Sequence, residues 1–408
     1  MHILFVHQSY ASQFAPVAEV MARSKDHRVT FVSTQPNRRH GAIENLHYDY
    51  SPDPHPAAPM PWRSVYARHL LHCQRVARVL EGRPDVRPDL VVGHSGLGPT
   101  LLIPEVLDCP IVSYFEYFMD TKRNDMLFRT DFEKPPWFRF WRRALNAVFL
   151  ADLANCRSGY SPTRWQRSLF PKEYRSKLRV LFDGIDTAVF RRLPTRPRQI
   201  GSLAIPDDTR IVTYASRGME SMRGFDVFMK VAKRIYERYP KVLFVVAGRE
   251  RVAYSTDPRV IGQSSFKKWV LKQDSYDLSK FRFVGWLPRP RLAQLFNASD
   301  LHVYLTTPFP LSWSLFSALA CGATVLASDT EPVREVITHG RNGLLADFFD
   351  VDGLAETALK VLRSPSSFRE LGRAAATHVQ DRYGADAVVP KLIRYFCRTA
   401  SARKPLDR

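Results

Sequence analysis

Short apolar runs alternate with amphipathic stretches along both halves of the chain. In the first half, an apolar run at 2–6 precedes a stretch of helical period at 14–22, and a second apolar run follows at 27–34. This order of strand, loop, helix and strand predicts a parallel sheet with helices on its faces. A segment at 191–201 is rich in Pro and Arg and poor in apolar residues, and we interpret it as an interdomain linker.

The same alternation restarts after this segment, which indicates a second domain of the same kind. We predict the α/β class, with Rossmann-like domains at 1–190 and 202–385 and a closing helix at 386–408 that is a candidate to cross back to the first domain. If the carboxyl ends of the two sheets face each other, they leave an interdomain cleft where ligands bind. The apolar runs that predict strands of the second domain lie at 210–216, 241–248, 281–288, 300–307, 324–329 and 342–349.

Other elements of the first half follow from composition and turn chemistry. The Pro-rich polar stretch at 51–61 predicts a loop, and 63–80 predicts a basic helix. Apolar runs at 88–99 and 110–118 predict buried strands. Ser161-Pro162 predicts a helix start, because the missing N–H of Pro costs nothing in a first turn.

Composition narrows the class of protein. The chain has 408 residues, 45% of them hydrophobic and 25% charged, which is typical of globular domains. Its net charge of +20 favours anionic partners, although a charge kept for solubility explains it equally well. The five cysteines show no metal-type spacing, so we expect a reduced, cytosolic protein. We expect no secretion signal, and no apolar run approaches the roughly 20 residues of a membrane-spanning helix.

Basic and aromatic residues alternate at 137–143, in the sequence WFRFWRR. Such a helix start could be an interfacial membrane anchor or the rim of an acceptor site. The alternative, which we favour, is a core helix whose exposed face is solvated by arginine, because the following ALNAVFLADLA is continuously apolar.

The strongest candidate site is the stretch from Phe309 to Gly322, where an apolar strand runs into a Pro-broken loop and a small-residue helix. Ser312 and Ser314 lie at the start of that helix, where unpaired N–H groups and the helix dipole favour an anion. Arg217 and Arg223 lie six residues apart on a Gly-flanked loop of the same domain. Two guanidinium groups near a helix start suit a diphosphate and need no metal.

A second candidate is His94, which lies just past the carboxyl end of a predicted strand. Catalytic and binding residues collect at such ends in open α/β sheets, although a lone His is as often a structural hydrogen bonder. The loop at 7–13 lacks the G-x-G-x-x-G pattern of dinucleotide-binding folds, which weakens a dehydrogenase interpretation.

Several motifs together resemble a known family. RGMESMRGF resembles the G-R-x-x-x-x-K-G element of the family-4 retaining glycosyltransferases of the GT-B fold, with Arg217 as its Arg and Arg223 in place of its Lys. LSWSLFSALACGATVLASDTEPVREVITHGRNGLL resembles their donor-binding element, DGIDTAVF their N-G-V-D-x-x-x-F turn, and GHSGLG the surroundings of a catalytic-region His, here His94. FVGWLP and SPTRWQRSLFP fit a bacterial branch of the family. The resemblance covers nearly the whole chain.

This resemblance implies transfer of a sugar from a nucleotide diphosphate sugar to an acceptor with retention of anomeric configuration. It implies that His94, Arg217 and Arg223 are catalytic, that the arginines hold the diphosphate, and that Gly184 and Asp186 shape the interdomain turn. The donor-side residues that it assigns are Arg217, Arg223, Gly248, Ser312, Trp313, Ser314, Leu315 and Ser317. The acceptor-side residues that it assigns are Ser9, Tyr10, His94, Ser95 and Glu116.

Two positions depart from the family's donor motif, in which two glutamates precede A-M-A-x-G. The first falls on Phe309, and the second, which is expected to bond the ribose hydroxyls, falls on Ser317. Serine cannot make the bidentate contact of a carboxylate. Either Glu220 or Glu335 compensates, or nucleotide affinity is weak, or the chain is a non-catalytic homologue that binds nucleotide sugar or glycan.

The expected partners follow from this activity. We expect a nucleotide sugar as donor, a glycan or lipid-linked acceptor, no cofactor or metal, and a role in cell-surface polysaccharide or glycolipid synthesis. The location would be the cytoplasm or the inner face of the cell membrane, to whose anionic lipids a basic surface is attracted. We do not expect nucleic acid as a partner, because the sequence shows neither a helix-turn-helix nor an aromatic platform.

Overall fold

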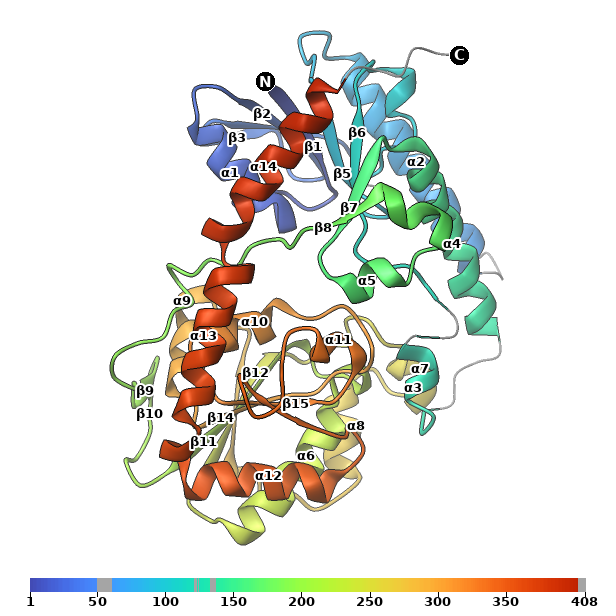
Figure 1. Ribbon diagram of the computed structural model, residues 1–408. Helices are drawn as coiled ribbons and strands as arrows, with labels where there is room; N and C mark the ends of the chain where they lie inside the picture. Colours follow the sequence, from blue (N-terminus) through green and yellow to red (C-terminus); the bar gives the residue numbers. More distant parts are fainter. Residues whose placement is uncertain (50–60, 121–122, 124, 133–136, 403–408) are drawn as a thin grey trace. The chain divides into compact units, whose positions relative to one another are not determined.

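The computed structural model describes residues 1–49, 61–120, 123, 125–132 and 137–402 (Figure 1). The loop predicted at 51–61 therefore lies outside the described residues, except for Pro61, which begins a helix. The chain forms two compact units. Unit 1 comprises Met1–Thr121, Pro136–Gly184 and Ala385–Arg408, and unit 2 comprises Lys122–Pro135 and Ile185–Gly384.

Unit 1 is built on an eight-stranded sheet, counted over the described residues, with the order β3-β4-β2-β1-β5-β6-β7-β8. All neighbours are parallel except β3 and β4, which form an antiparallel hairpin that the sequence pattern did not predict. The strands are β1 (His2–Val6), β2 (Arg28–Ser33), β3 (Arg38–His40), β4 (Ile43–His47), β5 (Leu90–His94), β6 (Ile111–Tyr114), β7 (Ser158–Ser161) and β8 (Leu178–Val180).

Helices cover the faces of this sheet, as the strand–helix alternation predicts. The closing helix α14 packs beside α1 although the two are far apart in sequence, and α2 packs against α4 (Figure 1). Because α14 belongs to unit 1 and α13 to unit 2, the chain does return to its first unit. The helices of unit 1 are α1 (Ala15–Arg23), α2 (Pro61–Glu81), α4 (Trp137–Asn155), α5 (Arg164–Ser168) and α14 (Ala385–Ser401).

Two local predictions in unit 1 need correction. Ser161 does not begin a helix, because it ends β7, and Thr163 is the N-cap of α5, its hydroxyl accepting the N–H of Gln166 at 3.1 Å. In α4, Phe138 is buried and Phe140 is 59% exposed, as in a core helix with a solvated face. The arginines are not all on that face, since Arg142 is buried and lies over the ring of Tyr117.

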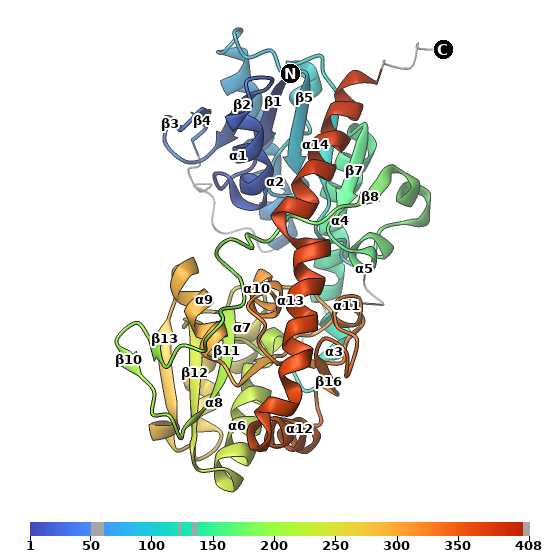
Figure 2. The same ribbon diagram turned by 60° about the vertical axis from the view of Figure 1, so that its left-hand side comes forward.

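Unit 2 is built on a six-stranded sheet, again over the described residues, with the order β13-β12-β11-β14-β15-β16 and every neighbouring pair parallel. Figure 2 shows β13, β12 and β11 side by side. The strands are β11 (Arg210–Gly218), β12 (Val242–Arg249), β13 (Phe281–Gly285), β14 (Leu301–Tyr304), β15 (Val325–Ser328) and β16 (Leu344–Ala346), with a separate hairpin of β9 (Gln199–Ile200) and β10 (Leu203–Ala204).

The helices of unit 2 enclose a core of buried aliphatic and aromatic side chains. Its amphipathic helix α6 buries Val227, Phe228 and Val231 against the sheet and packs beside α12. The helices are α3 (Asp125–Phe128), α6 (Phe225–Arg238), α7 (Asp257–Ile261), α8 (Phe266–Lys272), α9 (Arg289–Ala298), α10 (Trp313–Ala320), α11 (Glu331–Arg334), α12 (Val351–Arg363) and α13 (Arg369–Tyr383). One parallel and one mostly parallel sheet, both flanked by helices, confirm the predicted α/β class.

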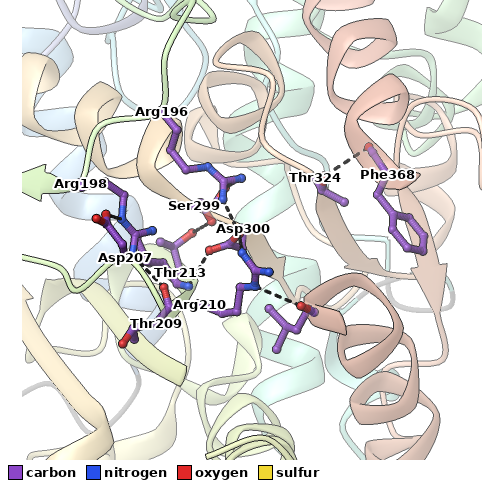
Figure 3. A network of polar contacts seen from close by, with 12 residues as sticks. Arg196, Arg198, Asp207, Thr209, Arg210, Thr213, Ser299, Asp300, Thr324 and Phe368 are labelled. Carbon is purple, nitrogen blue, oxygen red and sulfur yellow. Dashed lines mark hydrogen bonds and ion pairs between the residues drawn. The ribbon is translucent and has the colours of Figure 1, made fainter. Parts of the chain in front are cut away.

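Unit 2 recruits two segments that the sequence alone did not assign to it. Residues 122–135, from within the predicted first domain, belong to unit 2, and Phe132 joins its hydrophobic core. The segment at 191–201, interpreted as a linker, also belongs to unit 2. Figure 3 shows the reason, because Arg196 forms an ion pair with the fully buried Asp300 and donates to the carbonyl of Ser299.

The Asp300 network satisfies buried polar groups at the amino ends of β11 and β14. Asp300 accepts the N–H of Ile211 at 2.8 Å and lies 3.7 Å from Arg210 (Figure 3). A buried carboxylate needs such partners, since an unpaired one would be costly. These groups lie at the edge of the sheet opposite the carboxyl ends, so we assign them a structural role.

Candidate functional site

The strand order of unit 2 reverses between β11 and β14. From β11 the chain moves through β12 to β13 on one side, and it then returns to place β14 on the other side. Ligands of open α/β sheets bind at the carboxyl ends of strands where the order reverses. Arg217 lies at the carboxyl end of β11, and the residues after β14 lead to α10. The predicted diphosphate residues therefore meet at this point.

Arg223 is the most firmly held of these residues. It ends a short 3-10 turn, Ser221–Arg223, and is 5% exposed. Its Nη1 donates to Thr306 Oγ1 at 2.8 Å and to Tyr304 Oη at 3.4 Å, and its Nη2 donates to the carbonyl of Pro310 at 3.2 Å. These contacts use three of the five N–H donors of a guanidinium group. The structure thus brings Arg223 to the loop after β14.

Arg217 is exposed and lies beside an aromatic pair. Its Nη1 donates to Tyr254 Oη at 3.2 Å, and the Tyr254 ring lies 5.3 Å from the Phe309 ring. The guanidinium of Arg223 lies over both rings, at 5.5 Å from Tyr254 and 5.4 Å from Phe309. Phe309 stands where the first glutamate is expected, and its ring contacts the guanidinium of Arg223 instead. Sequence reasoning missed Tyr254, which follows β12 and is 42% exposed.

Glu220, one of the two residues considered as a substitute for the missing glutamates, lies in the interior. It is fully buried, and its Oε2 accepts the N–H groups of Ala253, Tyr254 and Ser255 at 2.8–3.0 Å. Burial raises the pKa of this carboxyl. Burial and the bonds to Oε2 therefore do not favour the alternative in which Glu220 binds the ribose. Its carboxylate holds the loop that carries Tyr254, so it acts on the arginines through that loop.

The start of α10 is capped by the protein itself. Ser312 is the N-cap, and its hydroxyl accepts the N–H of Ser314 at 3.2 Å, while its own N–H donates to Tyr304 Oη at 2.9 Å. The N–H of Leu315 donates to the carbonyl of Ser312. The N–H groups of Ser312, Ser314 and Leu315 already have acceptors within the protein. They are therefore not open to a phosphate, contrary to the expectation for Ser312–Ser314. Trp313 is 44% exposed at the first helical position.

Polar groups of α10 and Arg223 nevertheless line one small cavity of about 10 Å³. Such a volume suits a single water molecule. The hydroxyl of Ser314 donates to the carbonyl of Ala215 and so ties α10 to β11. Arg223, Tyr304, Ser312 and Ser314 are thus one connected group, which joins the two candidate elements of unit 2.

Three other predicted donor-side residues lie in the interior. Leu315 and Ser317 are buried in α10, so Ser317 does not present its hydroxyl at the surface. Gly248 has φ of 144°, a conformation that side chains rarely adopt, and a Cβ there would lie 2.4 Å from the carbonyl oxygen of Ser216. The absence of a side chain at Gly248 therefore allows β12 to lie close to β11.

In unit 1, His94 lies at the corresponding reversal of strand order, between β1 and β5. It is 3% exposed; its Nδ1 lies 2.8 Å from the carbonyl oxygen of Ser95 and its Nε2 3.3 Å from Glu116 Oε2. Its ring lies 5.3 Å from the ring of His7, which follows β1. Burial, with a smaller effect from His94, lowers the pKa of His7 to about 3. His7 was missed, although it directly follows an apolar strand.

Ser95 is bound into the interior rather than toward an acceptor. Its hydroxyl donates to Asp152 Oδ2 at 2.7 Å, and Asp152 is fully buried. Burial raises the pKa of Asp152 to about 6, and bonds from Ser95, Gly96 and Thr100 oppose that rise. Ser95 and Asp152 thus fix the turn after His94.

The other acceptor-side predictions lie near the end of β1. Ser9 is exposed, and its N–H donates to His7 Nδ1 at 2.8 Å. Tyr10 stacks on His40, with ring centres 4.0 Å apart. In the same loop Ser12 has φ of 44°, an uncommon conformation for a non-glycine residue. The structure therefore places Ser9 beside His7, and through it near His94, while Tyr10 faces the β3–β4 hairpin.

The predicted turn residues, Gly184 and Asp186, flank the point where the chain passes from unit 1 to unit 2. Gly184 has φ of 94°. Asp186 Oδ1 accepts the N–H groups of Ala188 and Val189, and its Oδ2 accepts Arg289 Nη2 at 2.7 Å. Both residues therefore shape the turn by backbone conformation and hydrogen bonding.

Neither a metal cluster nor a membrane span is found in the part of the chain that the structure describes. No group of three or more His, Cys, Asp or Glu side chains in these residues is arranged to hold a metal ion. None of their helices combines the length and apolar character needed to cross a bilayer.

Comparison with known proteins gives two adjoining family matches. Residues 25–190 match the model of the glycosyl transferase family 4 group, and residues 195–378 match that of glycosyl transferases group 1. The chain is 25% identical over 213 residues to N-acetyl-alpha-D-glucosaminyl L-malate synthase of Bacillus anthracis, covering 52% of this chain and 51% of the relative. It is 22% identical over 346 residues to phosphatidyl-myo-inositol mannosyltransferase of Mycolicibacterium smegmatis, covering 83% and 79%. The chain spans about half the length of several curated relatives it matches.

Solved structures share the fold of the whole chain. A sucrose-phosphate synthase from Thermosynechococcus elongatus aligns with a TM-score of 0.78 and 15% identity, over 98% of this chain and 99% of that one. The Anabaena protein HepE, solved with UDP and glucose, aligns with a TM-score of 0.68 and 14% identity, over 98% and 100%.

Proposed function

Because the chain belongs to the glycosyl transferase family 4 group and to glycosyl transferases group 1, with the GT-B fold, we propose that it transfers a sugar from a nucleotide diphosphate sugar to an acceptor with retention of anomeric configuration. Unit 2, with Arg217 and Arg223, would take the donor. Unit 1, with His94 and Glu116, would take the acceptor.

The observation that carries the proposal is the position of Arg223 beside Arg217 at the strand reversal of unit 2. Transfer of the sugar leaves a diphosphate, whose negative charge grows in the transition state. The guanidinium of Arg223, fixed in advance by Thr306, Tyr304 and Pro310, can stabilise that charge without reorganising. Buried Arg223 would supply a fixed charge, and exposed Arg217 would reach the outer oxygens.

On the acceptor side, His94 is oriented by two contacts. The Ser95 carbonyl contacts Nδ1 and Glu116 contacts Nε2 at the longer distance of 3.3 Å, so a sugar hydroxyl or the anomeric region would bond Nε2 by sharing or replacing the Glu116 contact. Curated relatives are named for D-inositol 3-phosphate and phosphatidyl-myo-inositol, both of which carry phosphate. A net charge of +20 supports an acceptor that carries phosphate or is lipid-linked, for a cell-surface glycan or glycolipid.

The two arginines also support metal-independent chemistry, because they supply the positive charge that a divalent ion would otherwise bring to the diphosphate. Addition of EDTA should therefore leave turnover unchanged, and loss of activity that Mg²⁺ or Mn²⁺ restores would contradict this. We also propose a cytoplasmic enzyme that associates peripherally with anionic lipid. Cosedimentation with phosphatidylglycerol vesicles, but not with phosphatidylcholine vesicles, would support that association.

A second candidate function is binding of nucleotide sugar or glycan without catalysis. It is favoured by one observation, namely that Phe309 and the buried Ser317 stand where two carboxylates are expected. The affinity for ribose would then be low, and the site would not position the donor for reaction.

Calorimetric titration and product analysis separate the two functions. The full-length chain is titrated with UDP-, GDP- and ADP-linked glucose, mannose and N-acetylglucosamine, and release of nucleoside diphosphate is followed by chromatography. Binding together with slow donor hydrolysis supports an active transferase. Binding without any hydrolysis or transfer supports the second function in its nucleotide-sugar form. No binding to any donor would contradict the transferase and leave glycan binding as the second function.

A further inference from the structure

The turn that carries Arg223 is held by Arg129, which lies nearly one hundred positions earlier in the sequence. Arg129 lies in the segment 122–135, which belongs to unit 2 although unit 1 sequence precedes and follows it. Its side chain is 1% exposed, so it is one of the largest fully buried side chains among the described residues. A guanidinium group is buried only where its charge and its donors have partners.

Arg129 bonds to both sides of the turn that ends in Arg223. Its Nη1 donates to the carbonyl of Ser221 at 2.7 Å, two residues before Arg223. The same group pairs with Asp226, three residues after Arg223, at 3.1 Å from Nη1 and 2.7 Å from Nη2. One rigid guanidinium therefore fixes the backbone before Arg223 and the first turn of α6 after it.

The far side of the guanidinium is closed as well. Asp131 accepts from Nε at 2.8 Å and from Nη2 at 2.6 Å, and the group lies 4.4 Å from the centre of the Phe132 ring. Phe132 belongs to the hydrophobic core of unit 2. The segment that brings Arg129 is thus held by its own neighbours, and Arg129 is a fixed point rather than a surface contact.

Charge makes the same residue important for an anionic ligand. The turn of Arg223 is surrounded by three buried carboxyl groups: Glu220; Asp257, which accepts the N–H and hydroxyl of Ser221; and Asp226. Buried carboxylates near Arg223 would offset its positive charge and weaken its attraction for a diphosphate. Arg129 pairs with Asp226, the one that directly follows the turn, and shares its single positive charge with the more exposed Asp131.

We propose that Arg129 is a positioning residue for the diphosphate group of the donor, which acts by fixing the turn that presents Arg223. This rests on the proposed function of the Arg217–Arg223 site. Arg129 itself does not touch the ligand. Its loss should weaken recognition of the diphosphate more than recognition of the rest of the nucleotide.

The variant that tests this must not leave an unpaired buried carboxylate. Arg129→Met combined with Asp226→Asn removes both charges together and also removes the bond to Ser221, so it is preferred to Arg129→Ala alone. Arg129→Lys keeps the charge, but it cannot reach Ser221, Asp226 and Asp131 together. Arg123→Ala is the matched control, because Arg123 lies in the same segment and pairs at the surface of unit 2 with the exposed Glu331.

The readout compares a nucleoside diphosphate with its monophosphate. Whichever of UDP, GDP or ADP binds the wild-type chain is titrated, together with the matching monophosphate, and thermal unfolding is measured for each variant. We expect the double variant to weaken diphosphate binding by about tenfold or more and monophosphate binding by less than about twofold, with Arg129→Lys in between and Arg123→Ala unchanged.

The outcomes distinguish this inference from the proposed function. If the wild-type chain binds none of the three diphosphates, the proposed function fails. If the folded double variant binds the diphosphate as the wild type does, or loses both affinities equally, Arg129 is merely structural and the inference is overturned. A selective loss of the diphosphate supports it.

Discussion

Tyr304 joins Arg223 to the start of α10 through a single phenol oxygen. Tyr304 Oη accepts Nη1 of Arg223 at 3.4 Å and the N–H of Ser312 at 2.9 Å, and the ring is 3% exposed. The buried arginine and the helix cap are thus coupled by a hydroxyl rather than by packing. Removal of that hydroxyl should therefore disturb both groups at once.

Tyr304→Phe should keep the packing of the ring and remove only this oxygen. We expect the free energy of unfolding to fall by about 1–2 kcal/mol, because the N–H of Ser312 loses its acceptor and Arg223 loses one of three. Urea denaturation measures the loss. We also expect weaker binding of nucleoside diphosphate, and unchanged binding would show that the phenol does not help to place Arg223.

Arg217→Ala should reduce turnover without harming the fold, because Arg217 is exposed whereas Arg223 is buried. Loss of one charged donor to the leaving diphosphate should lower kcat by about 100-fold or more. Release of nucleoside diphosphate from the donor is the measurement. Arg234→Ala is the control, because Arg234 pairs with Asp352 on exposed helix surface and should leave the rate unchanged. Equal rates in wild type and Arg217→Ala would remove Arg217 from the site.

Gly224→Ala tests the turn that directly follows Arg223. Gly224 has φ of 60°, and a Cβ there would lie 2.6 Å from Leu305 Cβ. We expect a loss of unfolding free energy of about 3 kcal/mol or more, from the left-handed conformation and the clash together. Gly262→Ala is the matched control, since Gly262 has φ of 67° and open space around it, and should cost about 1 kcal/mol. Equal losses in the two variants would mean that Leu305 moves to make room for the new methyl group.

Asp152→Asn should change how stability depends on pH. Because burial raises the pKa of Asp152 from 3.8 to about 6, its favourable contribution is full below pH 3.8 and is lost as pH rises through about 6. The asparagine variant should therefore gain stability relative to the wild type between these values, by up to about 3 kcal/mol. Ser95 can rotate its hydroxyl to accept from the new amide. Chemical denaturation from pH 4 to pH 7 measures the difference, and parallel curves would contradict the assigned pKa.

The sequence by itself determined the α/β class, the doubled strand–helix pattern and the residues at the carboxyl ends of strands. Apolar periodicity is a local property, so β1, α6 and β12 follow from it, and Arg217 and His94 can be located from the amino-acid order alone. The helix start at Ser312 could also be predicted from the sequence, since capping depends on neighbouring residues.

Only the tertiary structure decided which side chains are committed to the interior. Glu220 and Ser95 lie in motifs that suggested ligand contact, yet their partners are the 253–255 loop and Asp152, 33 or more positions away in sequence. The segment of Arg129 joined unit 2 because its guanidinium finds Asp226 and Ser221 there. Such pairings are set by long-range packing, which balances desolvation against hydrogen bonding and leaves no periodic signal along the chain.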